Sequence, residues 1–184
     1  MIALRQVTLQ RGAEPLFELI SETVIYDLAT NQAKNIAVRE FSAVTEASGC
    51  AVNDDTKTLY VGEAELGVWA INADAESDAN KQPVALVQPY GELKTEIGAL
   101  SVSQDGTLWL SATDDSMVYA YQAQTDTLSQ WSLAGEHTIE SVAASFINDN
   151  QAQLVSKGFS NPRKGNTKCL TSEFRVTTCT NHQK

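Results

Sequence analysis

A repeat of about 50 residues constrains the fold of this chain more than any other feature of its sequence. Residues 59–61, Leu-Tyr-Val, align with residues 108–110, Leu-Trp-Leu. Residues 68–71, Val-Trp-Ala-Ile, align with residues 118–121, Val-Tyr-Ala-Tyr, and Gly49 aligns with Gly98. Short strands that recur in this way are typical of β-propeller blades, four-stranded sheets that bury their faces against their neighbours. The sequence therefore predicts an all-β chain of the β-propeller class.

The strand pattern predicts a partial propeller at residues 1–156 and an irregular basic tail at residues 157–184. At roughly 45 to 50 residues per blade, the chain holds about three to four blades. Closed propellers usually have about four to eight blades, so the ring is expected to be incomplete. An incomplete ring leaves edge strands without partners, which favours self-association or docking on a second propeller domain.

Charge is unevenly distributed along the sequence. The net charge is −10, and residues 1–156 hold 7 Lys and Arg against 22 Asp and Glu, whereas residues 157–184 hold 6 against 1. An acidic body repels nucleic acid and anionic membranes, so neither is expected as a partner. No apolar run is long enough to cross a bilayer. The first residues do not form a signal peptide pattern.

The three cysteines point to no chemistry of their own. Cys50 lies in a predicted strand, where a small buried hydrophobic residue is expected. Cys169 and Cys179 lie in the basic tail and could pair in an oxidising compartment. No metal-binding spacing of cysteines is present.

Several short motifs follow one another between Val38 and Tyr121. They are Val-Arg-Glu-Phe at 38–41, Thr-Glu at 45–46, Gly-Cys at 49–50, Asn-Asp-Asp at 53–55, Leu-Tyr-Val-Gly-Glu at 59–63, Trp at 69 and Glu-Ile-Gly-Ala-Leu-Ser at 96–101. In this order and spacing the motifs resemble the central segment of the β-propeller phytases, or 3-phytases. Other propeller classes, such as lactonases, share only the repetition with this chain.

The resemblance implies a six-bladed fold and hydrolysis of the phosphate esters of myo-inositol hexakisphosphate. It implies calcium as the cofactor, in keeping with the preference of Ca²⁺ for oxygen ligands and the ability of metal ions to activate water. By the same resemblance, Glu46, Glu63 and Glu96 correspond to metal ligands and Arg39 to a substrate-binding residue. Secretion or a periplasmic location is also implied by the resemblance.

The motifs depart from the family pattern at several ligand positions. Ala47 and Ser48 are inserted between Glu46 and Gly49, and Gly98 stands where the family has a second calcium-binding Glu. Ser42 stands where a phosphate-contacting Lys is common. The predicted ligand set is therefore partial.

Two functions from different classes remain open at this point. The first is a calcium-dependent phytase-like phosphoric monoester hydrolase domain. The second is a catalytically weak propeller that binds calcium or phosphate, or that serves as an accessory domain to a complete phytase domain. The alternative for Glu63 is a solvated turn carboxylate, and Asp54 and Asp55 are expected to form a turn.

Overall fold

The computed structural model describes residues 2–11, 14–74, 76–78, 80–112, 117–132, 137–148, 151–160 and 169–177. Over these residues the chain forms strands, turns and bends, and it has no helix long and apolar enough to span a membrane. The strands are β1 (Ile2–Arg11), β2 (Glu14–Asp27), β3 (Gln32–Ala43), β4 (Ala47–Asn53), β5 (Thr58–Glu63), β6 (Gly67–Asn72), β7 (Gln82–Leu86), β8 (Ile97–Val102), β9 (Leu108–Ala112), β10 (Met117–Gln122), β11 (Thr127–Ser132), β12 (His137–Asn148), β13 (Gln151–Ser160) and β14 (Cys169–Thr177).

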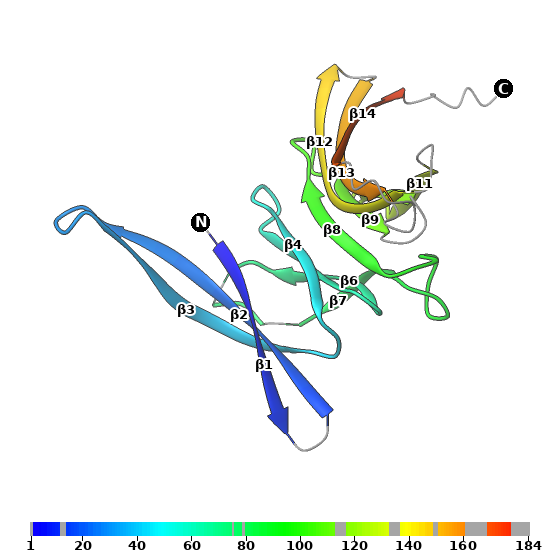
Figure 1. Ribbon diagram of the computed structural model, residues 1–184. Coiled ribbons are helices and arrows are strands. Elements are labelled where there is room, and N and C mark those ends of the chain that lie inside the picture. The colour runs from blue at the N-terminus through cyan, green and yellow to red at the C-terminus, as the bar shows by residue number, and fades with distance from the viewer. Residues whose placement is uncertain are drawn as a thin grey trace.

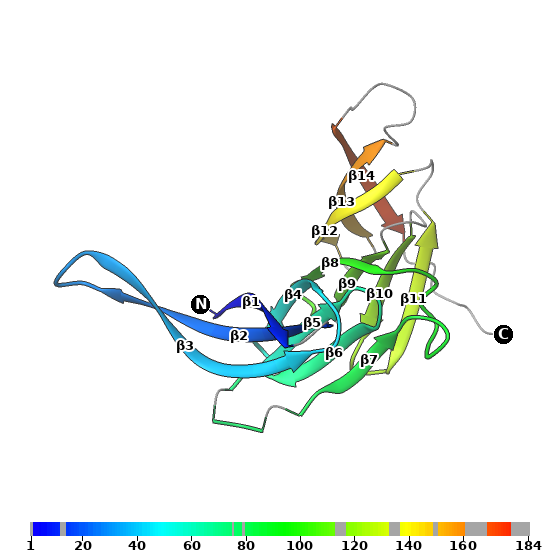
Figure 2. The same cartoon turned by 60° about the horizontal axis from the view of Figure 1, so that its bottom comes forward.

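Two consecutive four-stranded antiparallel sheets, β4 to β7 and β8 to β11, form the centre of the molecule. Each sheet is a meander in which consecutive strands pair, and the strand order is the same in both. We call them the first and second blades. Figures 1 and 2 show the two blades side by side, with β4 and β8 next to each other.

The strand registers confirm most of the predicted repeat. Val61 pairs with Trp69 in the first blade as Leu110 pairs with Tyr119 in the second. The alignment of Gly49 with Gly98 is wrong by one residue. Cys50 lies opposite Val61 and Leu100 lies opposite Leu110, so Gly49 corresponds to Ala99. The turns explain this. Val52 lies opposite Leu59 but Val102 lies opposite Leu108, so the β4–β5 turn has one residue more than the β8–β9 turn, and the offset is 50 between β4 and β8 but 49 between β5 and β9.

Three-stranded sheets flank the two blades on both sides. The sheet β1–β2–β3 precedes the first blade, and the sheet β12–β13–β14 follows the second. Strand β12 packs beside β8 and β9, in the way that β8 packs beside β4 and β5. The long β2–β3 hairpin extends away from the two blades (Figures 1 and 2). The four sheets together give the all-β blade architecture that the repeat predicts.

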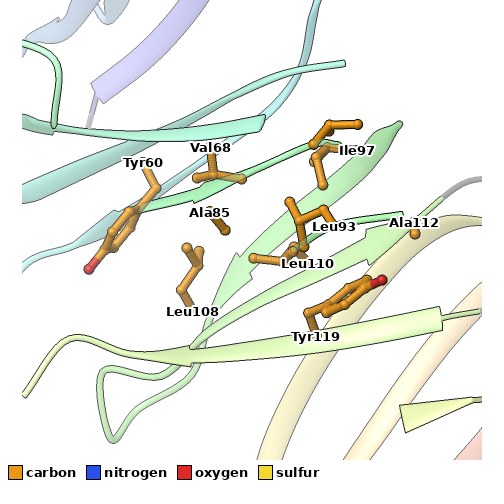
Figure 3. Packing of buried hydrophobic residues seen from close by; sticks show 10 residues of the cluster. Tyr60, Val68, Ala85, Leu93, Ile97, Leu108, Leu110, Ala112 and Tyr119 are labelled. Atoms are coloured by element: carbon orange, nitrogen blue, oxygen red, sulfur yellow. The ribbon is translucent and has the colours of Figure 1, made fainter. Parts of the chain in front are cut away.

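The middle strands of both blades are buried on both faces. On β5, Tyr60 packs into a cluster between the blades, whereas Leu59 and Val61 pack with Phe41 of β3. Side chains alternate between the two faces of a strand, so a strand buried on both faces is apolar throughout. Figure 3 shows the cluster between the blades, which includes Tyr60, Val68, Ala85, Leu93, Ile97, Leu108, Leu110, Ala112 and Tyr119. Burial of each large apolar side chain in it contributes about 1.5–3 kcal/mol.

Two expectations about local structure need correction. The segment after residue 157 is not irregular throughout, because Lys157 lies inside β13 and residues 169–177 form β14, which pairs with β13. Cys50 is exposed and lies on β4, which is an edge strand of its sheet. Cys179 lies outside the described residues. The domain boundary at residues 156 and 157 stays a prediction.

Candidate functional site

The three glutamates predicted as metal ligands come from segments that lie side by side at one edge of the blades. Glu46 precedes β4, Glu63 ends β5 and Glu96 precedes β8. The amide of Ala64 donates to the carbonyl oxygen of Glu46 at 3.0 Å, and the amide of Ile97 donates to the carbonyl oxygen of Ala64 at 2.9 Å. The backbone therefore brings together the three positions that the sequence singled out.

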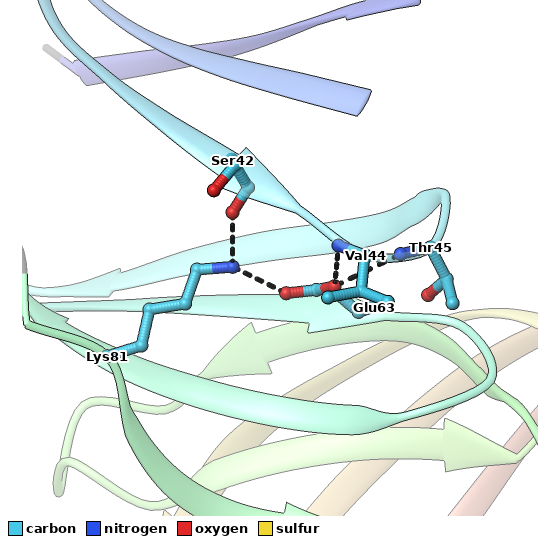
Figure 4. A network of polar contacts seen from close by, with 5 residues as sticks. All are labelled: Ser42, Val44, Thr45, Glu63 and Lys81. Atoms are coloured by element: carbon cyan, nitrogen blue, oxygen red, sulfur yellow. Dashed lines mark hydrogen bonds and ion pairs between the residues drawn. The ribbon is translucent and has the colours of Figure 1, made fainter. Parts of the chain in front are cut away.

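The side chain of Glu63 is the most buried of the three, with a relative exposure of 1%. Its Oε2 accepts hydrogen bonds from the amides of Val44 at 2.7 Å and Thr45 at 3.2 Å. Its Oε1 forms an ion pair with Lys81 Nζ at 2.6 Å (Figure 4). Both carboxylate oxygens of Glu63 thus have protein partners.

Lys81 is the partner of Glu63 that sequence reasoning missed. It lies directly before β7, and its Nζ also donates to the carbonyl oxygen of Ser42 at 2.7 Å (Figure 4). The ammonium lies 5.9 Å from the ring centroid of Phe41 and 5.8 Å from that of Trp69, distances at which the negative ring face attracts a cation. One signal was present: Lys81 is the only Lys or Arg between Lys57 and Lys94.

Arg39, predicted to bind substrate, contacts the backbone at the end of β6 and in the segment that follows it. Its Nη2 donates to the carbonyl oxygen of Asn72 at 2.6 Å, and its Nη1 donates to that of Ser77 at 3.3 Å. Its Nε is buried without a hydrogen-bond partner among the described residues. Arg39 and Lys81 therefore tie the β6–β7 connection to β3, and the substrate-binding role of Arg39 stays a prediction.

Glu46 and Glu96 have exposed side chains at the same edge. Among the described residues, however, no three His, Cys, Asp or Glu side chains converge closely enough to hold a metal ion. Calcium needs about six to eight oxygen ligands. Both oxygens of Glu63 already accept hydrogen bonds, from Lys81 and from the amides of Val44 and Thr45. The described residues therefore do not fit a calcium site at Glu63. The predicted roles of Glu46 and Glu96 stay predictions.

The turns at the opposite end of the blades hold their own polar side chains. Asn53 Oδ1 accepts from the amides of Asp55 and Thr56 at 3.1 and 3.2 Å. In the second blade, Asp105 accepts from the Thr107 amide at 3.1 Å and from the Ser103 hydroxyl at 2.7 Å. Asp54 and Asp55 lie in the turn between β4 and β5, as predicted. These contacts satisfy the turn backbone and point to no ligand.

Comparison with solved structures defines the class of the fold. A luciferin-regenerating enzyme superposes with a TM-score of 0.52 at 17% identity, over 77% of this chain and 44% of the other. A gluconolactonase from Xanthomonas campestris superposes with a TM-score of 0.53 at 14% identity, over 79% of this chain and 44% of the other. The fold is therefore that of a β-propeller, and the chain spans less than half the length of these structures.

A family model then identifies the chain more closely. The Phytase family model matches residues 9–146, which include the last three residues of β1, all of β2 to β11 and most of β12. A search of curated proteins finds no match. The chain belongs to the phytase family, and the resemblance seen in its motifs is confirmed.

Proposed function

We propose that this chain is a phytase-like phosphoric monoester hydrolase domain that acts on myo-inositol hexakisphosphate. The single observation that carries the proposal is the match of the Phytase family model to residues 9–146. The exposed carboxylates of Glu46 and Glu96 lie at one edge of the blades, where they could bind a polyanionic substrate only through bridging cations. Calcium is the cofactor that family membership implies, and secretion or a periplasmic location follows from the same resemblance.

A second candidate function is favoured by the Glu63 ion pair. A carboxylate neutralised by Lys81 weakens the case for metal chemistry at this position. The alternative is that the chain is a binding or accessory propeller that packs against a complete phytase domain. The three-stranded sheets support this alternative, because β1 and β14 are edge strands of their sheets and offer backbone groups for pairing.

Phosphate release from myo-inositol hexakisphosphate tests the first proposal. The full chain is assayed with calcium and with a chelator, beside the variants Glu46→Gln and Glu96→Gln. Their exposed side chains make them safer probes than Glu63, whose loss would leave the Lys81 ammonium without its carboxylate partner. Asp55→Asn, at an exposed turn position at the other end of β4 and β5, is the matched control.

Calcium-dependent release that falls at least tenfold in Glu46→Gln or Glu96→Gln, and not in Asp55→Asn, is the expected result. No release from the folded chain under any condition would overturn the hydrolase proposal. Light scattering over a range of chain concentrations separately tests self-association of this chain through its edge strands. A mass that stays at one chain throughout would contradict it.

A further inference from the structure

The Glu63 carboxylate is buried and is paired with a lysine ammonium of the same chain. It is 1% exposed, and a buried carboxylate is costly unless it is paired and hydrogen-bonded. Here it receives two amide hydrogen bonds on one oxygen and an ammonium at 2.6 Å on the other. The charge is compensated entirely within the chain.

The Lys81 ammonium also has partners within the chain. Its side chain is 21% exposed, so the stem is largely removed from water. One hydrogen bond goes to the Glu63 carboxylate and one to the Ser42 carbonyl oxygen, and two aromatic rings lie within 6 Å of the nitrogen. Displacement of this ammonium by a metal ion would break both hydrogen bonds and expose an unpaired cation.

The second blade shows that the fold does not require this pair. Glu63 pairs with Ala47 across β4 and β5, and the residue in the corresponding register is Ala112, which pairs with Ile97 across β8 and β9. Ala112 is fully buried and apolar. A blade can therefore be built at this position without any charge, so the carboxylate and its ammonium form a unit particular to the first blade.

We propose that the Lys81 ammonium permanently fills the cation position at the Glu63 carboxylate, so that Glu63 is a structural ion-pair partner and is not a calcium ligand. This inference concerns Glu63 alone. It does not rest on the proposed hydrolase activity, which can depend on carboxylates elsewhere. It is incompatible with the prediction that Glu63 binds calcium, and one experiment separates the two.

The experiment follows thermal unfolding of the full chain in a chelator and in increasing calcium. Four proteins are compared: wild type, Glu63→Gln, Lys81→Met and the double variant that carries both substitutions. Glu63→Gln keeps an acceptor for the Val44 and Thr45 amides, and Lys81→Met keeps an unbranched side chain beside the Phe41 and Trp69 rings. Glu65→Gln and Lys94→Met remove an exposed carboxylate and an exposed ammonium as controls.

Each single substitution in the pair is expected to lower Tm by roughly 6–20 °C, because it leaves one buried charge without its partner. The double variant is expected to be more stable than the sum of the two single losses predicts. Any change in Tm caused by calcium should be the same in wild type and in the double variant. If either single variant fails to fold, this last comparison still decides the question.

Two results would overturn the proposal. One is a calcium-dependent rise in wild-type Tm that disappears in the double variant, because the rise would then require Glu63 or Lys81. The other is strict additivity of the two single losses, which would mean that the two side chains do not act as a pair. Because the readout is unfolding, the absence of phosphate release would leave this proposal intact.

Discussion

The first and second blades have the same strand order and corresponding registers, yet the last residue of the second strand is charged in one blade and apolar in the other. At the end of β5, Glu63 is held by Lys81 and two backbone amides. At the end of β9, Ala112 packs in the apolar cluster between the blades. Equivalent backbone positions therefore carry an ion pair in one blade and a methyl group in the other.

This difference shows which positions the fold constrains and which it leaves open. The middles of the faces between blades are constrained, because Leu59 and Val61 of β5 and Leu108 and Leu110 of β9 bury the neighbouring sheets. The strand ends are open to variation, provided that any polar group placed there has a partner. Substitutions made at corresponding positions of the two blades test this rule.

The largest effect is expected when the carboxylate of the first blade is placed in the second. Ala112→Glu would bury a charge with no ammonium to meet it among the described contacts of that site, at a cost of about 3–5 kcal/mol. Chemical denaturation measures the loss. Ala112→Gln, which has nearly the same size and no charge, is the matched control.

The pH dependence separates charge from size in this pair of variants. Burial without a partner would raise the pKa of the introduced carboxyl in the folded state above its unfolded value. The deficit of Ala112→Glu relative to Ala112→Gln should therefore be absent at low pH and grow as the pH rises above about 4.3. Equal stability of the two variants at neutral pH would contradict the rule.

A smaller loss is expected from Gly67→Ala at the start of β6. Gly67 has a φ of 134°, and a Cβ there would overlap the carbonyl oxygen of Ala85. The corresponding position in the second blade holds Met117, whose φ is not positive. Gly67→Ala should cost about 2–3 kcal/mol through strain and overlap. Met117→Leu, which nearly conserves volume, should stay within about 1.5 kcal/mol by the same denaturation measurement.

The repeat made the blade architecture predictable, because the short apolar runs of β5 and β9 are a local property of the sequence. Glu63 was singled out by the resemblance of its motif to the phytases. Its partner was not, because Lys81 lies 18 residues further along the chain and arrives through the β6–β7 connection. No local pattern encodes a contact made by a long side chain across such a connection.

The basic tail was misjudged for a different reason. Its composition lacks the acidic, aromatic pattern of the blades, but β14 forms by pairing with β13 along its whole length. Pairing with a neighbouring strand overrides weak local preference. The Gly49 alignment failed because sequence similarity does not reveal that the β4–β5 turn is one residue longer than the β8–β9 turn.

The turns of the two blades give the third prediction. Asp105 accepts three hydrogen bonds from Ser103 and Thr107, and Ser103 Oγ in turn accepts from Trp109 Nε1 at 3.0 Å. Asp105→Asn removes the charge and one acceptor, so it should cost about 1–2 kcal/mol in urea unfolding. Asp55→Asn in the first blade should change stability by less than about 0.5 kcal/mol, since the exposed side chain of Asp55 makes none of the turn contacts described. Equal losses in the two turns would show that Asp105 and its partners add nothing to the fold.

The smallest effect concerns Tyr121, which corresponds in register to the buried Ile71 of the first blade. Burial raises the pKa of Tyr121, and the hydrogen bond from its hydroxyl to Asp126 Oδ1 at 3.0 Å and the Asp126 charge raise this pKa further. Asp126→Asn should move the pKa of Tyr121 part of the way back and change stability at neutral pH by less than about 0.5 kcal/mol. Asn suits this position, because Asp126 has a φ of 52° and Asn tolerates that region.

The sign of the pH effect follows from the raised pKa. The contribution of Tyr121 to stability is complete below the unfolded tyrosine pKa of about 10, and it is lost as the pH rises through the folded value. Asp126→Asn should make that loss shallower. A titration of tyrosinate absorbance, with Tyr121→Phe subtracted to isolate this ring, measures the shift. An unchanged titration would mean that burial alone sets the pKa, and that the polar pair at this edge of the second blade, unlike the ion pair of the first, is incidental.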